Sequence, residues 1–332
     1  MILIIYGTRP EYLKVKPLIG KLKDKNINYK TLFTGQHETL ISENADFNFK
    51  FSDLCDNRLN NILSNCLNFP GEWFEGITHV LVQGDTTSAL GLALAAFHKK
   101  IKVIHLEAGL RSYDKENPYP EESNRLLISN LADIHLCPTE MNKNNLLKEN
   151  INSNVYVVGN TGLDNLINYK NKCSYDNNIL ITLHRRENHN KIDKWFSVIN
   201  DIASKYKGYN FILPLHPNPS VLKHKTILTN INIVSPLSHD ELLNILVKTK
   251  LVITDSGGIQ EECSFLNKKC LICRKTTERP ESLEKTSFLI HDPNDLYENF
   301  EKHINNYNVN YDCPFGLGNS SELICNIIKD VL

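Results

Sequence analysis

Residues 79–106 read HVLVQGDTTSALGLALAAFHKKIKVIHL, and this stretch decides the fold class. Residues 79–83 and 102–106 are short runs rich in Val, Ile and Leu, as buried β-strands are. Between them, residues 88–98 consist mostly of Ala and Leu, which favour a helix. Because parallel neighbouring strands need a crossover connection, a helix between two buried strands is typical of a parallel sheet. The stretch therefore predicts an α/β fold.

The same alternation continues on both sides of this stretch. In the first half we expect a helix at residues 17–25 and further strands at residues 2–6, 29–33, 134–137 and 155–158. A polar stretch at residues 168–178 follows, and the second half then predicts strands at residues 179–183, 210–214, 232–234, 251–254 and 270–273. The sequence thus predicts two Rossmann-like domains, each a doubly wound parallel sheet, that face a cleft. The predicted boundaries are 1–167 for the first domain, 168–178 for a linker, 179–319 for the second domain and 320–332 for a C-terminal helix that packs back on the first domain.

Length and composition exclude several classes of protein. A chain of 332 residues is long for a single core, which agrees with two domains. It has 37 Lys and Arg against 38 Asp and Glu, so no excess charge favours nucleic acid or an anionic membrane. No apolar run approaches the roughly 18 residues of a membrane-spanning helix, and the apolar residues 1–6 are too short for a signal peptide.

The nine cysteines are scattered and odd in number, which is typical of a reduced, cytoplasmic protein. Cys270 and Cys273 have CxxC spacing, but no second CxxC and no pair of histidines accompanies them. We therefore interpret them as part of a buried strand, and we expect no metal site.

Three carboxylates follow strands or turns in the predicted first domain. Asp85 comes shortly after residues 79–83, Glu107 directly after residues 102–106, and Glu121 after a proline-rich turn that precedes a helix. Each of them alone has an ordinary explanation: Asp85 as an N-cap, Glu107 as the partner of a nearby Arg, and Glu121 as an acid that suits the dipole at the start of a helix. Three acids at successive loop ends of one sheet favour acid–base chemistry instead.

Residues 254–262, TDSGGIQEE, carry the strongest signal for an anionic ligand. A strand runs into Ser256, Gly257 and Gly258, and a helix follows. Small residues let the N–H groups at the start of a helix approach a phosphate, and Glu262, further along the helix, suits a ribose diol. Neither a GxGxxG nor a Walker pattern occurs, which disfavours a dinucleotide or ATP.

Basic side chains follow other predicted strands. Arg9 and Lys14 come after the first strand, His184 after residues 179–183, and Arg279 after residues 270–273. Arg can bind a phosphate through two hydrogen bonds, and His can act as an acid, a base or a phosphate donor. The alternative is that they are ordinary surface charges and an ordinary loop histidine.

Taken together, the motifs resemble those of the non-hydrolysing UDP-N-acetylglucosamine 2-epimerases. The resemblance runs from Gly7 to Glu281 and rests on GTRPE (7–11), GQH (35–37), QGDTTS (83–88), HLEAGLRS (105–112), PEESNR (120–125), GNTGLD (159–164), HRREN (184–188), LHPNP (215–219), TDSGGIQEE (254–262) and TTERPE (276–281). It implies a glycosyltransferase-B type of fold, a homodimer, a UDP-sugar substrate and no cofactor.

The resemblance also implies roles for individual residues. The implied acid–base residues are Asp85, Glu107, Glu121 and His184. The implied substrate-binding residues are Arg9, His184, Ser256, Gly257 and Gly258 at the diphosphate, Glu262 at the ribose, Lys14 and Arg279 in the pocket, and Leu237 and Leu242 near the uracil. Many relatives bind a second UDP-N-acetylglucosamine as an activator, and the corresponding residues are Gln36, His37, Arg186 and His216.

The implied reaction is an elimination followed by a readdition. UDP leaves carbon 1 as a base removes the proton of carbon 2, and UDP then returns to the 2-acetamidoglucal as a proton arrives on the opposite face. The alternatives are a 2-epimerase of another UDP-hexosamine (a diacetamido-uronic acid or an L-sugar), a hydrolysing epimerase, a glycosyltransferase of the same fold, and a non-catalytic binding protein.

Overall fold

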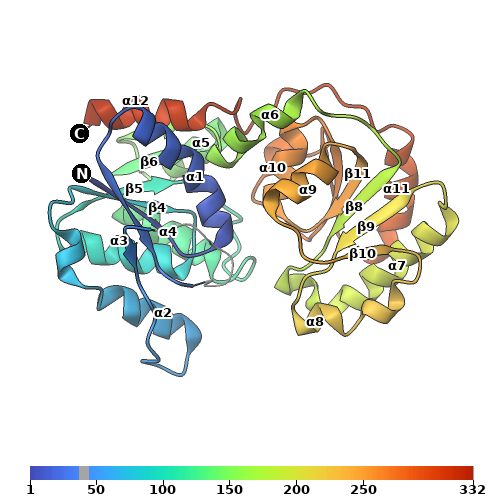
Figure 1. The fold of residues 1–332 in the computed structure, drawn as a ribbon, viewed down its shortest axis with the longest axis horizontal. Helices are drawn as coiled ribbons and strands as arrows, with labels where there is room; N and C mark the ends of the chain where they lie inside the picture. The colour runs from blue at the N-terminus through green and yellow to red at the C-terminus, as the bar shows by residue number, and fades with distance from the viewer. Residues whose placement is uncertain (37–44, 332) are drawn as a thin grey trace. The chain divides into compact units, whose positions relative to one another are not determined.

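The computed structural model describes residues 1–36 and 45–331, except for the side chain of Arg186. These residues divide into two compact units (Figure 1). The first unit comprises Met1–Asn165 and Gly316–Leu332, and the second comprises Leu166–Phe315. The chain therefore returns to the first unit slightly before residue 320.

The first unit is built on a sheet of seven parallel strands in the order β3-β2-β1-β4-β5-β6-β7. These strands are β1 (Ile2–Tyr6), β2 (Tyr29–Phe33), β3 (Phe47–Asn48), β4 (His79–Gln83), β5 (Lys102–Leu106), β6 (Ile134–Cys137) and β7 (Val155–Val157). Their order reverses direction at β1 and β4, which defines a doubly wound sheet. The sequence did not indicate β3, which is only two residues long.

Helices cover both faces of this sheet. They are α1 (Arg9–Asp24), α2 (Arg58–Leu67), α3 (Thr87–His98), α4 (Glu121–Leu131), α5 (Glu140–Lys148) and α12 (Ser320–Val331). Ile2 and Ile4 of β1 pack in a core with α1 and α12, whereas Leu3 and Ile5 pack in the core of the opposite face with α2 and α3. Successive side chains of a strand point to opposite faces, so a strand buried on both sides is apolar throughout.

Helix α1 begins at Arg9, well before the expected residue 17. The Thr8 hydroxyl accepts a hydrogen bond from the Glu11 N–H, and the Glu11 carboxylate accepts one from the Thr8 N–H at 2.7 Å. This reciprocal capping box starts the helix directly after β1, and Pro10 is compatible with a first turn.

The C-terminal helix α12 packs against α1 in the core of the first unit. Ile324, Cys325 and Ile328 are buried there. The Asp164 carboxylate accepts hydrogen bonds from the N–H groups of Ser320 and Ser321, at 3.0 and 2.8 Å, and so caps the start of α12.

The second unit contains six parallel strands in the order β10-β9-β8-β11-β12-β13. The strands are β8 (Asn178–Thr182), β9 (Asn210–Pro214), β10 (Asn232–Val234), β11 (Thr249–Thr254), β12 (Lys269–Cys273) and β13 (Ser287–Ile290). The helices are α6 (Ile167–Lys170), α7 (Ile192–Lys205), α8 (Pro219–Leu222), α9 (His239–Leu246), α10 (Gly257–Phe265) and α11 (Leu296–Ile304). Strand β13 was absent from the prediction.

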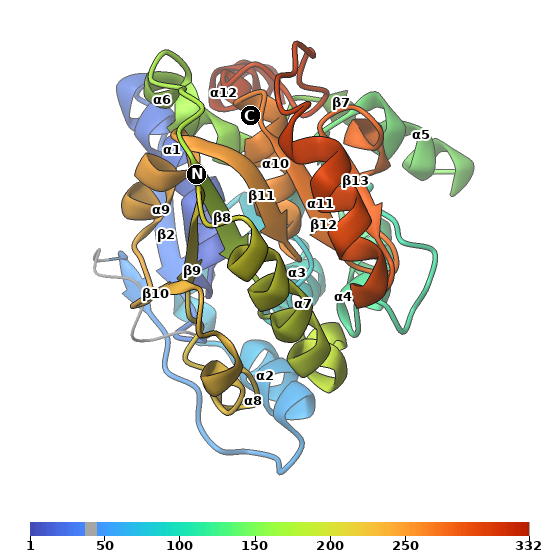
Figure 2. The same cartoon turned by 90° about the vertical axis from the view of Figure 1, so that its right-hand side faces the viewer.

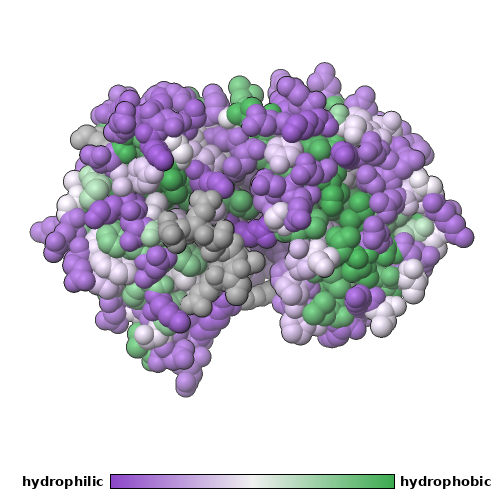
Figure 3. Space-filling view, viewed as in Figure 1, coloured by the Kyte–Doolittle hydropathy of each residue, from purple (hydrophilic) through white to green (hydrophobic). Residues whose placement is uncertain are grey.

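Helices α7 and α11 lie side by side on one face of the second sheet (Figure 2). Trp195 and Phe196 of α7 and Phe300 of α11 fill the core beneath them. On the face of the molecule shown in Figure 3, hydrophilic residues predominate, and hydrophobic residues gather mainly over β8, β9 and β10.

Residues 171–177, part of the expected linker, follow the second unit closely. The Ser174 N–H donates to the Val247 carbonyl at 2.9 Å, and the Asp176 N–H donates to the Lys248 carbonyl at 3.0 Å. The buried Lys268 ammonium donates to the carbonyls of Ser174 and Thr249. Within the described ranges, no helix has both the length and the apolar composition that crossing a membrane requires.

Candidate functional site

The strand order of each unit marks where a ligand site is expected. In a doubly wound sheet, the loops after the two strands at the reversal diverge and leave a crevice at the carboxyl edge. In the first unit these strands are β1 and β4, which Arg9 and Asp85 follow. In the second unit they are β8 and β11, which His184 and Ser256 follow.

Asp85 contacts helix α4 and does not cap a helix. Arg125 donates from Nε and Nη2 to Oδ2 of Asp85, at 2.8 and 2.6 Å, and the Asn124 amide donates to the Asp85 carbonyl at 2.8 Å. The N-cap of α3 is Thr86, whose hydroxyl accepts from the Ala89 N–H at 3.1 Å. The N-cap explanation of Asp85 is therefore wrong, because Asp85 pairs with Arg125 instead.

Glu107 is buried, and both of its carboxylate oxygens are engaged. The Lys14 ammonium donates to Oε1 and the Gln83 amide donates to Oε2. The backbone of Glu107 has φ of +69°, a conformation rare for a side chain of this size. This turn follows β5 directly and keeps the carboxylate at the carboxyl edge of the sheet.

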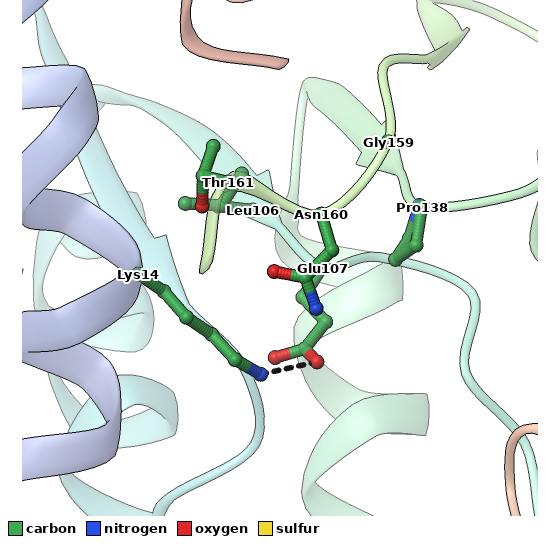
Figure 4. A pocket seen from close by; sticks show the side chains of 7 residues that line it. All are labelled: Lys14, Leu106, Glu107, Pro138, Gly159, Asn160 and Thr161. Carbon is green, nitrogen blue, oxygen red and sulfur yellow. Dashed lines mark hydrogen bonds and ion pairs between the residues drawn. The ribbon is translucent and has the colours of Figure 1, made fainter. Parts of the chain in front are cut away.

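A shallow pocket, partly open to solvent, lies beside this ion pair. Figure 4 shows Lys14 reaching from α1 toward Glu107, and the side chain of Asn160 pointing into the same space. The pocket is lined by Lys14, Leu106, Glu107, Pro138, Gly159, Asn160 and Thr161. Its walls combine one charged pair with small polar and apolar groups.

Glu121 is the first residue of α4, the helix whose Asn124 and Arg125 contact Asp85. Its neighbour Glu122 is more deeply buried and accepts from the N–H groups of Ser112 and Tyr113 and from Arg125. The structure thus ties Asp85, Glu107 and the start of α4 to the same end of the first sheet, through Gln83 and Arg125.

A further buried acid of the first unit, Glu11, was missed as a site residue. Its carboxylate accepts from the N–H groups of Gly7 and Thr8 and from the Thr86 hydroxyl, the last at 2.6 Å. Burial raises the pKa of Glu11, and these hydrogen bonds oppose the rise. Glu11 therefore joins the loop after β1 to the loop after β4.

In the second unit, Asp255 connects the loops at the reversal of strand order. It is fully buried and accepts from the N–H groups of His184 and Arg185 and from the Asn188 amide. Nδ1 of His184 lies 3.5 Å from Oδ1 of Asp255. Burial lowers the pKa of His184, and the nearby Asp255 carboxylate opposes this effect.

His216 stacks on His184, with ring centroids 5.2 Å apart and an angle of 8° between the planes. Burial and the neighbouring His184 lower the pKa of His216. Of the other residues compared with a second-ligand site, Gln36 accepts from the Ser88 hydroxyl at 2.8 Å in the first unit. His37 and the side chain of Arg186 lie outside the described residues.

The start of α10 has the form expected of an anion site. Ser256 is the N-cap, and Gly257 and Gly258 begin the helix. A Cβ at Gly257 would collide with the Arg279 guanidinium, whereas the nearest atom to a Cβ at Gly258 is the Ser256 hydroxyl at 3.8 Å. Gly257 therefore makes room for a protein side chain, and Gly258 leaves space for a ligand.

Arg279 is engaged within the protein. It donates to the carboxylates of Glu261 and Glu278, and Glu278 also pairs with Arg274 at 2.9 Å. All four side chains are buried. Arg279 thus supports the glycine turn from beneath, a contact that the sequence did not indicate.

Glu262, the expected ribose ligand, contacts α9. His239 Nε2 lies 2.9 Å from Glu262 Oε1, and Oε2 of Glu262 is buried with no hydrogen-bond partner among the residues that the structure describes. Leu237 lies in the loop before α9, and Leu242 lies within α9, where its N–H donates to the Ser238 carbonyl at 3.1 Å. Ser238 caps this helix.

The residues missed from sequence share one property. Glu11, Gln83, Arg125 and Asp255 stand inside recognised motifs, but each contacts a side chain or backbone group from another motif. Their positions in the motifs are the only sequence signal. His239 had no signal of its own. In the described part of the chain, no group of three His, Cys, Asp or Glu side chains has the geometry of a metal site.

The fold type is confirmed by comparison with a distant structure. The crystal structure of MurG from Acinetobacter baumannii superposes with a TM-score of 0.59 at 10% identity, covering 99% of both chains. At this identity the likeness concerns the fold alone. Together with the two parallel sheets, it defines an α/β protein with a glycosyltransferase-B type of fold.

Closer relatives define the family. The model of the UDP-N-acetylglucosamine 2-epimerase family matches residues 21–329. A UDP-N-acetylglucosamine 2-epimerase from Campylobacter jejuni is 35% identical over 381 residues, which cover 98% of this chain and 97% of that protein. The crystal structure of a UDP-GlcNAc 2-epimerase from Neisseria meningitidis bound to UDP-GlcNAc superposes with a TM-score of 0.90 at 34% identity, over 99% of both chains. The chain therefore belongs to the UDP-N-acetylglucosamine 2-epimerase family, whose members are isomerases.

Proposed function

We propose that the chain reversibly inverts carbon 2 of UDP-N-acetylglucosamine to give UDP-N-acetylmannosamine. The observation that carries the proposal is the likeness, over 99% of both chains, to an epimerase bound to UDP-GlcNAc. Two contrasting groups of side chains support it, one at the carboxyl edge of each sheet.

The second unit supplies the nucleotide site in this proposal. The N–H groups at the start of α10 and the His184 imidazole stabilise the diphosphate, and the open space at Gly258 admits it. The unsatisfied Glu262 Oε2 accepts a ribose hydroxyl, which removes the cost of a buried acceptor without a donor. Leu237 and Leu242 mark the segment assigned to the uracil, and Arg279 holds the glycine turn in place.

The first unit supplies the acid–base groups. The carbon 2 proton has no neighbouring carbonyl to acidify it, so direct removal is disfavoured. Loss of UDP breaks the bond from carbon 1 to oxygen as a carboxylate takes the carbon 2 proton, and readdition reverses both changes with the proton delivered to the opposite face. Asp85, Glu107 and Glu121 are the acids for these steps, and Arg9 and Lys14 are the cationic residues of this unit assigned to the substrate.

Lys14 and Arg125 fix the positions of two of these carboxylates. Each sits on a carboxylate through direct hydrogen bonds, Lys14 on Glu107 and Arg125 on Asp85. A carboxylate that is fixed in place before the substrate binds needs less rearrangement in the proton-transfer step.

The test is proton NMR of the protein with UDP-N-acetylglucosamine in deuterium oxide. We expect signals of UDP-N-acetylmannosamine, deuterium at carbon 2 and no accumulation of free UDP. Free UDP with free N-acetylmannosamine would replace the proposal by a hydrolysing epimerase. No reaction with this sugar, but the same exchange with another UDP-hexosamine, would change the substrate and leave the reaction class intact.

Two further properties follow from the same proposal. Light scattering is expected to give the mass of a homodimer. Activation by a second UDP-N-acetylglucosamine, assigned to Gln36, His37, Arg186 and His216, predicts a sigmoidal dependence of rate on substrate. A hyperbolic curve would remove these four residues from the proposal.

A further inference from the structure

Asp255 is a buried carboxylate that accepts several hydrogen bonds from the loop after β8. Its Oδ2 accepts from the His184 N–H at 2.9 Å, the Arg185 N–H at 2.8 Å and the Asn188 amide at 3.0 Å. Asn188 is itself fixed, because it donates to the Cys273 carbonyl at 2.9 Å and accepts from the Trp195 indole at 3.2 Å. These three N–H donors distinguish Oδ2 from the other carboxylate oxygen and fix the orientation of the Asp255 side chain.

The other oxygen, Oδ1, accepts more weakly from the His184 N–H, at 3.2 Å, and faces the imidazole of His184. The distance from Oδ1 to Nδ1 is 3.5 Å, at the outer limit of a hydrogen bond. Hydrogen bonds of this kind are often long before a ligand is bound and shorten in the complex. Among the described residues, none forms a hydrogen bond with Nε2 of His184.

We propose that Asp255 is a positioning residue that holds His184 as the Nδ1–H tautomer and directs Nε2 toward the diphosphate of UDP. The inference rests on the proposed function for the identity of the ligand. Asp255 also precedes Ser256, the N-cap of α10. The same residue therefore links the orientation of His184 to the position of the start of α10.

The charge on His184 follows from its surroundings. Burial lowers its pKa, which favours the neutral ring; Asp255 opposes this effect, while Arg185 and His189 reinforce it. The stacked His216 is the other titratable ring in contact. When the anionic diphosphate binds, Nε2 takes a proton from solvent and donates it in a hydrogen bond to a phosphate oxygen, and the imidazolium lies between two anions.

The variant Asp255→Asn makes the inference testable. The three N–H donors require an acceptor at the Oδ2 position, so the amide oxygen of Asn occupies it and the amide NH₂ replaces Oδ1. That NH₂ donates to Nδ1 of His184, and the neutral ring must then carry its proton on Nε2. The substitution therefore inverts the tautomer, at the cost of the weaker of the two contacts that the His184 N–H makes with Asp255.

The experiment records long-range proton–nitrogen NMR of the histidine rings of the full-length protein, at a pH where His184 is neutral, with His184→Gln as the assignment control. We expect Nδ1–H in the wild type, Nε2–H in Asp255→Asn, and two protonated nitrogens in the wild type with UDP. A wild-type ring protonated on Nε2 alone, or a tautomer that Asp255→Asn leaves unchanged, would overturn the inference. The wild-type measurement decides the matter even if the variant fails to fold.

Kinetics separate positioning from a general structural role. Asp255→Asn removes the carboxylate that stabilises the imidazolium as UDP leaves, so kcat falls by about 100-fold or more. UDP affinity, measured by calorimetry, changes only a few-fold because Nε2–H can still donate. In the double variant with His184→Gln, kcat is expected to match that of His184→Gln alone; losses that multiply in full would contradict the inference.

Asn188→Leu is the matched control for the loop. It removes one donor to Oδ2 without touching the imidazole, so it should lower Tm and keep the wild-type tautomer. The NMR measurement of the tautomer and the calorimetric titration with UDP do not depend on catalytic turnover. A wild type that shows both but does not invert UDP-N-acetylglucosamine would refute the proposed reaction and leave the role of Asp255 standing.

Discussion

The two units have the same strand order around the reversal point but present different chemistry there. In each, one buried acid joins the two loops, Glu11 in the first unit and Asp255 in the second. Around Glu11 the sheet edge carries acids paired with cations, such as Asp85 with Arg125. Around Asp255 it carries backbone N–H groups, an imidazole and a glycine turn.

The difference shows that one architecture can be adapted either to moving protons or to holding an anion. Proton transfer needs carboxylates that are placed within hydrogen-bond reach of the proton they take. Anion binding needs N–H groups and space, which the helix start at Ser256 and Gly258 provides. The shared fold positions the loops, and the side chains on them decide the chemistry.

The largest expected effect comes from removing an acid of the first unit. Asp85→Asn should lower kcat by about 1,000-fold, while UDP binding, assigned to the second unit, stays within a few-fold of wild type. NMR time courses of the reaction measure kcat, and calorimetry measures UDP binding. The exposed Glu140→Gln of the same unit is the control and should keep wild-type turnover. Wild-type turnover of Asp85→Asn would remove Asp85 from the mechanism.

A smaller effect is expected on stability when the Lys14–Glu107 pair is broken. Lys14→Met removes the cation that pairs with the buried Glu107 carboxylate, and should lower the free energy of unfolding by about 2 kcal/mol. The control is Lys21→Met, on the same helix as Lys14. It breaks an exposed pair with Glu322 of α12 and should cost less than about 1 kcal/mol. Urea denaturation compares the two. Equal losses would show that Glu107 does not depend on Lys14.

The second unit should weaken in acid through His303. This buried ring stacks on Phe288, with centroids 3.8 Å apart, and burial with the charges of Lys269 and Lys302 lowers its pKa to about 4. Since the unfolded chain binds this proton more readily, stability is lost as pH falls from 6.5 toward 4, by about 2 kcal/mol.

His303→Leu should remove that part of the pH dependence, as measured by urea denaturation across this range. The exposed His291→Leu is the matched control and should keep the wild-type slope. A slope that His303→Leu leaves unchanged would assign the acid sensitivity to other groups.

The smallest expected effect separates the two glycines of α10. Gly258→Ala should leave Tm equal or slightly higher, because Ala favours a helix, but should weaken UDP binding about tenfold by filling the ligand space. Gly257→Ala should lower stability by about 1 kcal/mol, since it displaces the Arg279 guanidinium. Thermal melts and calorimetry measure both. If both variants bind UDP like wild type, the start of α10 is not the diphosphate site.

Much of the site was predictable because its residues stand at strand ends. The apolar runs located β4, β5, β8 and β11, and so placed Asp85, Glu107, His184 and Ser256 at the carboxyl edges of the sheets. The sequence also indicated the glycine turn. Strands β3 and β13 escaped prediction, and both are short, with two and four residues.

The pairing of side chains was decided only by the tertiary structure. Lys14 and Glu107 are 93 positions apart, and His184 and Asp255 are 71 apart. Strand order brings these residues together, and local sequence does not encode that order. The sequence determined which elements form and which chemical groups follow them, because burial periodicity and turn preferences act over a few residues. The fold decided which acid meets which cation, because that depends on strands that are neighbours in space and distant in the chain.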